Sequence, residues 1–591
     1  MSIIYTVSII ALFVLTLLIK KKEDKIDAIK AITFNLILIL AYNSLICYVL
    51  NLINIPITLI SLSVINLLMI VCTTVKLIVD KKIQKYKLEG TSLIFTGVLI
   101  FTVFIIFKFY IQNINQVVYL TGDSQSHYIV AREFSENTQL TNKAKTNCSI
   151  GPTFMILAYT NEGIIFKVLQ PYIGTLALFS VYTVFESILY AMTGLIFYFL
   201  AQKYCNKNIY TKILLMVFSI LYVIGYPLSA WTSGFHYLIV GIMFVTAIVY
   251  AIDNIINDNE INFKYKVLVM FLLNFGIIFS YCLFCPFVYL AEFIYFIYKY
   301  WKNEKIKLLI LILLTLVIPG IMGVIYLICP NTTVMTSGIA MEGYVYKNYW
   351  SNFILFIPFS IYCIYYCVKN KKINFENIIL ICLLCFIVIL FVGTKMGKCS
   401  EYYFFKNYFP LWTLIIYTAV KGIIEFGKDG KIEKILSYVF ISIYMLIFTI
   451  SMIYIYTPQS FETHDNLKNT MEIYTLNKAM IMYMNPIVSN SEMELYEQME
   501  NSLEDNRKQN SKDEVIFITD RVQEVWINCL MGYTNGIMKD EKQCIENMKN
   551  NAYKYVIVIN DTEAKEKYQR YLDMDKLNLV YENEKGKIYS K

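Results

Sequence analysis

A carboxylate and an imidazole lie four residues apart in the first long polar segment of this chain, Thr121–His127. If Asp123 begins a short helix, His127 follows one turn later on the same face, because residues four apart on a helix are neighbours. Side by side, the two groups could accept a proton and bind a phosphate. Asp123 could instead be an N-cap that accepts from free backbone N–H groups. The segment alone leaves both interpretations open.

The rest of the chain indicates a membrane protein. It has 591 residues, of which 57% are apolar and only 16% charged. Apolar segments long enough to cross a hydrocarbon core of ~30 Å recur throughout. We therefore predict an α-helical polytopic protein with about fourteen transmembrane helices, at 3–19, 31–53, 57–79, 91–110, 171–201, 211–225, 236–253, 267–283, 286–301, 307–328, 351–368, 378–394, 407–425 and 435–456.

Charge placement predicts the orientation of these helices. Seven lysine-rich segments, from Lys20–Lys30 to Lys421–Lys434, all fall on one side if the crossings alternate. The positive-inside rule makes that side the cytoplasm. The N-terminus, the 111–170 segment, the 395–406 loop and everything after 456 would then lie outside. Abundant Ile, Lys, Asn and Tyr suggest an AT-rich bacterial genome, and hence a bacterial plasma membrane.

Two stretches on the predicted outer side, one apolar and one rich in lysine, could contribute to a binding site. Thr153–Ile165 is too short to span, so we expect an interfacial helix that lies along the membrane, with a loop helix packed on the bundle as the alternative. The 395–406 loop carries three lysines that the positive-inside rule disfavours there. A lipid phosphate docking near them would offset that cost, although they could equally bind ordinary anionic headgroups or pair with Glu401.

Ionisable residues and cysteines inside the crossings give weaker signals. Glu186 and Glu292 fall within apolar spans, where such groups face a cavity or a structural partner. The CxxC pairs at Cys282 and Cys382 lack histidine partners, so neither zinc nor redox chemistry is indicated. Three cysteines would face outside and could form disulfides, and the sequence does not decide whether they do: Cys148, Cys329 and Cys399.

The tail 457–591 changes character and has 23 acidic against 17 basic residues. Residues 457–512 look polar and helical. Two apolar runs, Val515–Thr519 and Tyr555–Asn560, read as strands, and Leu577–Tyr581 with Lys587–Tyr589 reads as a closing hairpin. With helical stretches near 522–530, 541–550 and 563–571, this predicts a small extracytoplasmic α/β domain.

These features together resemble the GT-C superfamily of membrane glycosyltransferases, which use polyprenyl-phosphate sugars. The motifs that carry the resemblance are Gly122-Asp123-Ser-Gln-Ser-His127 and Tyr402-Tyr403-Phe-Phe-Lys406. The resemblance extends from about Thr91 to the end. It implies a transmembrane core at 91–456, an extracytoplasmic domain at 457–591 and an N-terminal addition at 1–90. The acid follows the fourth helix here, whereas family members usually carry it after the first.

The resemblance also implies a reaction, the inverting transfer of a sugar to an extracytoplasmic glycan, lipid or protein acceptor. Asp123 would be the general base. His127 and Lys406, with Lys398 or Arg132, would hold the donor phosphate. Tyr402, Tyr403, Glu401 and Glu186 would line the substrate groove. Many members carry paired acids, whereas Ser124 follows Asp123 here, so no cofactor is assigned and a divalent cation would be compatible.

Two other functions fit the same sequence. A non-enzymatic transporter or flippase for lipid-linked glycans would use the groove and the outer lysines without a base. A degenerate member of the fold could act as an assembly scaffold through its C-terminal domain. Partners beyond a lipid-linked donor, its acceptor and membrane lipids are not indicated, and nothing suggests nucleic-acid binding.

Overall fold

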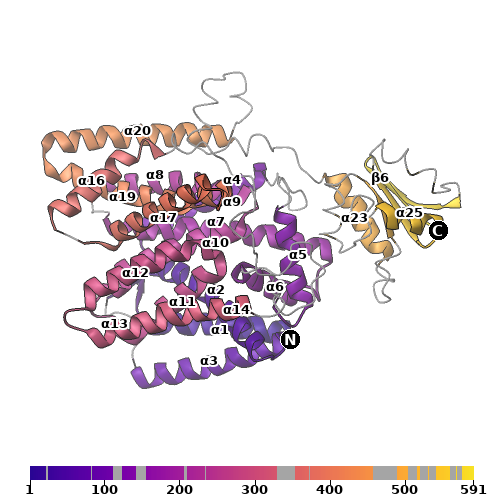
Figure 1. Cartoon of the computed structure of the whole chain (residues 1–591), viewed down its shortest axis with the longest axis horizontal. Helices are drawn as coiled ribbons and strands as arrows, with labels where there is room; N and C mark the ends of the chain where they lie inside the picture. The colour runs from indigo at the N-terminus through magenta and orange to yellow at the C-terminus, as the bar shows by residue number, and fades with distance from the viewer. Residues whose placement is uncertain are drawn as a thin grey trace.

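The structure is a computed structural model. The residues it describes are 1–20, 24–81, 83–110, 123–140, 155–204, 209–232, 234–328, 353–371, 373–456, 489–503, 515–519, 541–559 and 576–591, with Ile527, Leu530, Tyr568 and Tyr571. Helices form most of it and stack side by side in a bundle, with a small sheet near the C-terminus (Figure 1).

The first half of the bundle runs from α1 to α10. Its helices are α1 (Ser2–Leu18), α2 (Ala28–Leu52), α3 (Leu59–Asp80), α4 (Gly90–Tyr110), α5 (Asp123–Glu136), α6 (Ile156–Leu169), α7 (Thr175–Ala201), α8 (Ile209–Val223), α9 (Tyr226–Thr232) and α10 (His236–Ala251). A short parallel bridge joins β1 (Ile26–Asp27) to β2 (Tyr86–Lys87) at the start of α2 and α4.

The second half continues the stack. Its helices are α11 (Phe263–Tyr281), α12 (Cys285–Tyr300), α13 (Lys305–Leu311), α14 (Ile318–Ile328), α16 (Ile357–Lys369), α17 (Phe375–Lys395), α18 (Glu401–Lys406), α19 (Tyr408–Asp429) and α20 (Lys431–Tyr456). A π-helical segment, Ile312–Val317, connects α13 to α14 just before Pro319.

Ten helical segments among the described residues are long and apolar enough to cross a membrane, so the chain is a multi-pass membrane protein. One of the ten, Phe263–Tyr300, doubles back as the sequence predicts. Lys266 near its start and Lys299 near its end both donate to the Ile256 carbonyl, at 3.0 and 2.8 Å. The extended backbone of Tyr281 (φ −152°, ψ 91°) allows this turn between α11 and α12. The total of fourteen crossings stays a prediction.

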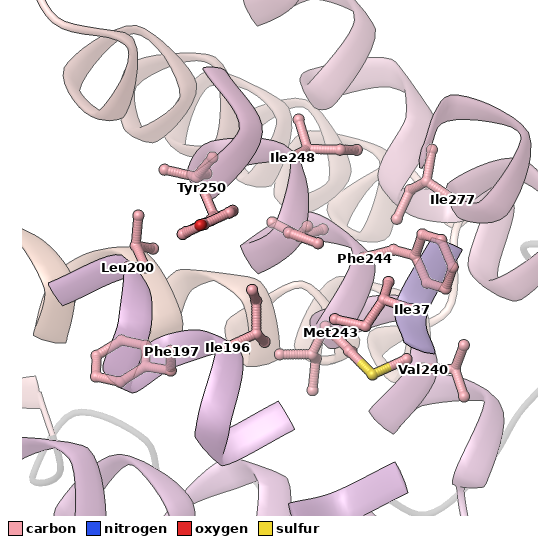
Figure 2. Close-up of a cluster of buried hydrophobic side chains, with 14 of the residues drawn as sticks. Ile37, Ile196, Phe197, Leu200, Val240, Met243, Phe244, Ile248, Tyr250 and Ile277 are labelled. Atoms are coloured by element: carbon pink, nitrogen blue, oxygen red, sulfur yellow. The ribbon is translucent and has the colours of Figure 1, made fainter. Parts of the chain in front are cut away.

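Helix α10 lies at the centre of the bundle. Every one of its residues from His236 to Ala251 is buried. Apolar side chains of α2, α7 and α11 surround it, and Figure 2 shows Ile37, Ile196, Phe197 and Ile277 grouped around Val240, Met243, Phe244, Ile248 and Tyr250. A helix that is apolar on all sides needs such neighbours on all sides. The helices around α10 are thereby fixed relative to one another.

The interfacial location expected for Thr153–Ile165 is wrong, and the packed alternative is correct. Helix α6 is buried on nearly its whole surface, including Tyr159, Asn161 and Glu162. Its polar groups explain this location, because Asn161 donates to the Leu40 carbonyl of α2 at 3.0 Å and the Thr160 and Ser44 hydroxyls lie 2.6 Å apart. Because these polar side chains of α6 form hydrogen bonds with α2, packing in the bundle stabilises the helix more than a position at the lipid surface would.

The C-terminal unit has the predicted strands and closing hairpin. Its four-stranded sheet has the order β3 (Val515–Ile518), β4 (Tyr555–Ile559), β6 (Gly586–Ser590) and β5 (Asn578–Glu582). Strands β3 and β4 are parallel, and β6 pairs antiparallel with both β4 and β5. Alternate residues of β3 and β4 point to opposite faces, covered by α23 (Asn490–Leu503) and α25 (Glu541–Lys549). The helices predicted near 522–530 and 563–571 lie largely outside the described residues.

The tight packing of α16 on α19 leads to a stability prediction. A Cβ on Gly422 would lie 1.9 Å from the Phe359 carbonyl oxygen, so no side chain fits between the two backbones. We expect Gly422→Ala to lower the free energy of unfolding by about 1–3 kcal/mol through overpacking. Thermal unfolding of the purified protein in detergent measures this. Gly320→Ala is the control, because nothing lies within 4 Å of a Cβ at that helical position. Equal stability of both variants would contradict the prediction.

Candidate functional site

Helix α5 carries the sequence motif into the bundle. Its described residues run from Asp123 to Glu136, so Asp123 and His127 lie one turn apart on one helix. The side chain of Asp123 lies outside the described residues, so its role as base or cap stays a prediction. Ser124 and His127 are both buried, and the Ser124 hydroxyl has no hydrogen-bond partner among the described residues. The start of α5 is therefore an interior feature rather than an exposed loop.

The start of α5 packs against a turn at Gly234, just before α10. Gly234 has φ +72°, a backbone conformation that other residues rarely adopt. A Cβ there would lie 2.7 Å from the Ser124 backbone nitrogen and closer still to its hydroxyl. The close contact between the turn at Gly234 and the start of α5 therefore requires a glycine at position 234.

Two of the three histidines in the chain meet at this contact. The rings of His127 and His236 are 4.7 Å apart and nearly perpendicular, at 82°. The Tyr159 hydroxyl is 2.5 Å from His127 Nδ1, and the Tyr182 hydroxyl is 3.2 Å from His236 Nδ1. Each imidazole is held in place by a tyrosine from a different helix, α6 or α7.

Two fully buried carboxylates flank His236. Glu162 Oε1 of α6 lies 3.7 Å from Nε2, and Glu186 Oε1 of α7 lies 3.8 Å from Nδ1. Both distances exceed a hydrogen bond, and neither oxygen of Glu162 has a hydrogen-bond partner among the described residues. We refer to His127, His236, Glu162 and Glu186 as the histidine cluster.

Burial favours the neutral forms of Glu162 and His127. Loss of water raises the pKa of the Glu162 carboxyl well above its usual value, and the nearby Glu186 raises it further. Burial lowers the pKa of His127 well below its usual value, with smaller contributions from His236 and Lys406. A neutral imidazole at neutral pH can accept a proton or a hydrogen bond.

Lys406 approaches the histidine cluster from α18. It is 2% exposed and donates to the Tyr237 hydroxyl at 2.6 Å. Its ammonium group lies 3.9 Å from the centre of the Tyr402 ring and 4.7 Å from that of Phe235, in cation–π contact. The Tyr237 ring is also 4.9 Å from the His127 ring. His127 and Lys406, which the sequence assigns to one phosphate site, therefore converge on a single tyrosine.

The other predicted site residues divide into two groups. Tyr402, Tyr403 and Glu186 lie with Lys406 or the histidine cluster. Lys398 and Glu401 are exposed. These two positions do not join the buried cluster.

Arg132 is directed elsewhere. Its Nε donates to Glu136 at 3.0 Å, and its Nη1 donates to the Leu530 carbonyl at 3.1 Å. Arg132 therefore links α5 to the C-terminal unit, and its described contacts favour a positioning role over phosphate binding.

Sequence reasoning missed four members of the site: Tyr159, Glu162, His236 and Tyr237. Glu162 lies in a stretch read as interfacial, where a carboxylate attracts no notice. The signal that could have found His236 is scarcity, since a histidine at the edge of an apolar span is unusual in a chain with only three. Pairing it with His127 required the fold.

The remaining polar and sulfur groups have local roles. Glu292 accepts from Asn274 at 2.7 Å within the α11–α12 hairpin, which is the structural pairing considered for it. Cys399 is a buried free thiol, as are Cys363 and Cys367, whereas Cys148 and Cys329 lie outside the described residues. Among the described residues, no group of three or more His, Cys, Asp or Glu has the geometry to hold a metal ion.

The turn at Gly234 gives a prediction about site assembly. We expect Gly234→Ala to lower the free energy of unfolding by about 1–3 kcal/mol, since both the positive φ and the contact with the Ser124 backbone oppose a methyl group. Thermal unfolding measures the loss. Gly97→Ala, at an open position in α4, should have little effect. An unchanged melting temperature for Gly234→Ala would show that α5 does not depend on this turn.

Glu162 gives a prediction about pH. A carboxyl with a raised folded pKa stabilises the fold fully below its unfolded pKa and loses that stability as the pH rises. At pH 8 the free energy of unfolding of Glu162→Gln should therefore exceed that of the native chain by about 2 kcal/mol. This difference should decrease towards pH 4. Melting curves at several pH values measure this, with exposed Glu260→Gln as the control. A difference that does not vary with pH would contradict the assignment.

Comparison with known proteins identifies no family for this arrangement: no protein-family model matches the chain, and no curated protein matches it in sequence.

Proposed function

We propose that this protein is a membrane glycosyltransferase that moves a sugar from a polyprenyl-phosphate donor to an extracytoplasmic acceptor. The convergence of His127 and Lys406 on Tyr237 carries the proposal. These residues come from α5 and α18, far apart in the sequence, and both are buried in an apolar bundle. Ionisable groups are costly in such surroundings and usually mark a substrate site.

The donor phosphate is the natural partner of Lys406. The buried ammonium group of Lys406 is surrounded by aromatic rings and donates to the Tyr237 hydroxyl, and a donor phosphate beside it would add a charge-assisted hydrogen bond. The first turn of α5 adds the Ser124 hydroxyl, which has no hydrogen-bond partner among the described residues, and the N-terminal end of a helix favours an anion. Tyr402 and Tyr237 would form apolar walls beside the sugar.

The reaction needs little beyond orientation and charge stabilisation, because the leaving phosphate is already stable as an anion. The acceptor oxygen attacks the anomeric carbon from the face opposite the phosphate, and the carbon–oxygen bond to the phosphate breaks with inversion. The phosphate leaves with the bonding electrons. Asp123 takes the acceptor proton, since an ordinary aspartate is ionised at neutral pH.

Neutral His127 would support this reaction as a hydrogen-bonding group rather than a cation. Its Nδ1 faces Tyr159, which fixes the ring and leaves Nε2 for substrate. The positive charge in the site then comes from Lys406 and the helix terminus.

Movement of a lipid-linked glycan without chemistry is the second candidate. The observation that favours it is the pair of carboxylates on either side of His236, because buried carboxylates beside imidazole occur in proton relays of transporters. A transporter would require Glu186 more than Asp123. A bacterial plasma membrane location, with the site facing outside, belongs to either proposal.

Transfer assays with purified protein and a panel of radiolabelled polyprenyl-phosphate sugars test the enzyme. We expect the native chain to transfer sugar, Asp123→Asn to abolish transfer while folding normally, and Lys406→Met to reduce it ~100-fold or more through lost phosphate stabilisation. Asn still caps a helix, so Asp123→Asn separates base from cap.

The control is Lys428→Met, which removes an exposed lysine from the same apolar segment and should leave transfer unchanged. Full activity in Asp123→Asn would exclude it as the base. Donor binding without transfer by the native chain, together with loss of glycan movement in Glu186→Gln, would favour the transporter.

A further inference from the structure

A cavity of about 830 Å³ lies at the other end of the helices that form the histidine cluster. Helices α7 and α10 contribute Glu186 and His236 to that cluster, and their last turns contribute Gln202, Tyr250 and Asn254 to the cavity. From His236 to Tyr250 the helix rises roughly 21 Å. The cavity is therefore a separate site, on the side where the lysine-rich segments lie.

The cavity wall has both charge signs. Five lysines line it: Lys25, Lys30, Lys87, Lys203 and Lys212. Lys87 pairs with Glu89 at 2.6 Å, and Lys203 lies 3.7 Å from Asp253. Lys212 of α8 is half-buried and forms no hydrogen bond or ion pair with any described residue. A partly buried ammonium without a counter-ion calls for an anion.

Asp27 supplies the complementary feature. It is 4% exposed, and its Oδ1 accepts from the Ile29 backbone at 3.3 Å as the N-cap of α2. Its Oδ2 is buried and has no hydrogen-bond partner among the described residues. A buried carboxylate oxygen without a donor is costly. Asp27 and Lys212 line the same cavity without pairing, so a ligand between them would satisfy both.

Helix ends and aromatic rings complete the site. Gly90 and Thr91 at the start of α4 line the cavity beside the start of α2, and helix N-termini favour anions. A methyl group on Gly90 would meet open space, so no neighbouring atom crowds this position. Phe34, Tyr198 and Leu215 form an apolar wall where the first carbons of a lipid or of a small organic phosphate would fit.

We propose that this cavity binds a phosphate ester that carries a hydroxyl or amine next to the phosphate. The phosphate contacts Lys212 and the helix ends, and the hydroxyl or amine donates to Asp27 Oδ2. The chemistry fits a phospholipid headgroup such as phosphatidylethanolamine or phosphatidylglycerol, and it also fits a soluble ester such as phosphoethanolamine or glycerol phosphate. This proposal does not depend on the glycosyltransferase assignment.

Native mass spectrometry of the full chain distinguishes the two sources. Protein released from nanodiscs is scored for retained phosphatidylethanolamine, phosphatidylglycerol, phosphatidic acid and phosphatidylcholine. Calorimetry in phosphatidylcholine nanodiscs then measures binding of phosphoethanolamine and glycerol phosphate. Retention of the first two lipids assigns a headgroup, whereas binding of the esters alone assigns a soluble ligand.

Variants connect binding to the cavity. Lys212→Met should weaken binding of the ligand ~10-fold or more, and exposed Lys264→Met, on the same side of the bundle, should not. Asp27→Asn keeps the N-cap and should weaken binding of phosphatidylethanolamine or phosphoethanolamine more than that of phosphatidic acid, which lacks the extra donor. The proposal is overturned if neither class binds, or if binding is the same in the native chain, Lys212→Met and Asp27→Asn.

Discussion

The constraint on which this structure depends is that α10 must be covered on every side. All of its side chains from His236 to Ala251 are buried, so α2, α7 and α11 have to pack against it along its length. Those contacts fix where the polar groups at its two ends can lie. The histidine cluster forms at the beginning of α10, and the lysine-lined cavity forms just beyond its end. One apolar helix thus separates two polar sites and fixes their positions relative to each other.

The polar groups in the two sites are stabilised by different means. Near the start of α10, aromatic rings replace water: Tyr159 and Tyr182 orient the imidazoles, and Tyr237, Tyr402 and Phe235 surround Lys406. At the other end, Lys87 pairs with Glu89 and Lys203 lies near Asp253, whereas Asp27 and Lys212 face the open volume unpaired among the described residues. A third group, Lys421 with Glu376, is a closed ion pair to which Tyr204 adds a hydrogen bond at 3.2 Å. The direct contact between Lys421 and Glu376 is consistent with a structural role.

Much of the fold follows from periodicity and charge. Runs of apolar residues predict the spans, the break near Cys282 predicts the α11–α12 hairpin, and two short apolar runs predict the strands at Val515 and Tyr555. The site is harder to predict, because its members come from five helices. His127 and Lys406 stand out by type in their segments, whereas Glu162 and Tyr159 sit in a short apolar stretch whose location depends on Asn161 and Thr160. Hydrogen bonds to α2 decide that location, and no local pattern reports them.

The α11–α12 hairpin has a consequence for biogenesis. Its single buried carboxylate, Glu292, already accepts from Asn274 of the same hairpin, and Tyr289 donates to the Asn274 carbonyl. A lysine lies near each end of the hairpin, and both Lys266 and Lys299 donate to the carbonyl of Ile256, which precedes the hairpin in the sequence. The hydrogen bonds at Asn274 join the two helices within one hairpin, so the pair can form before the later helices have been synthesised.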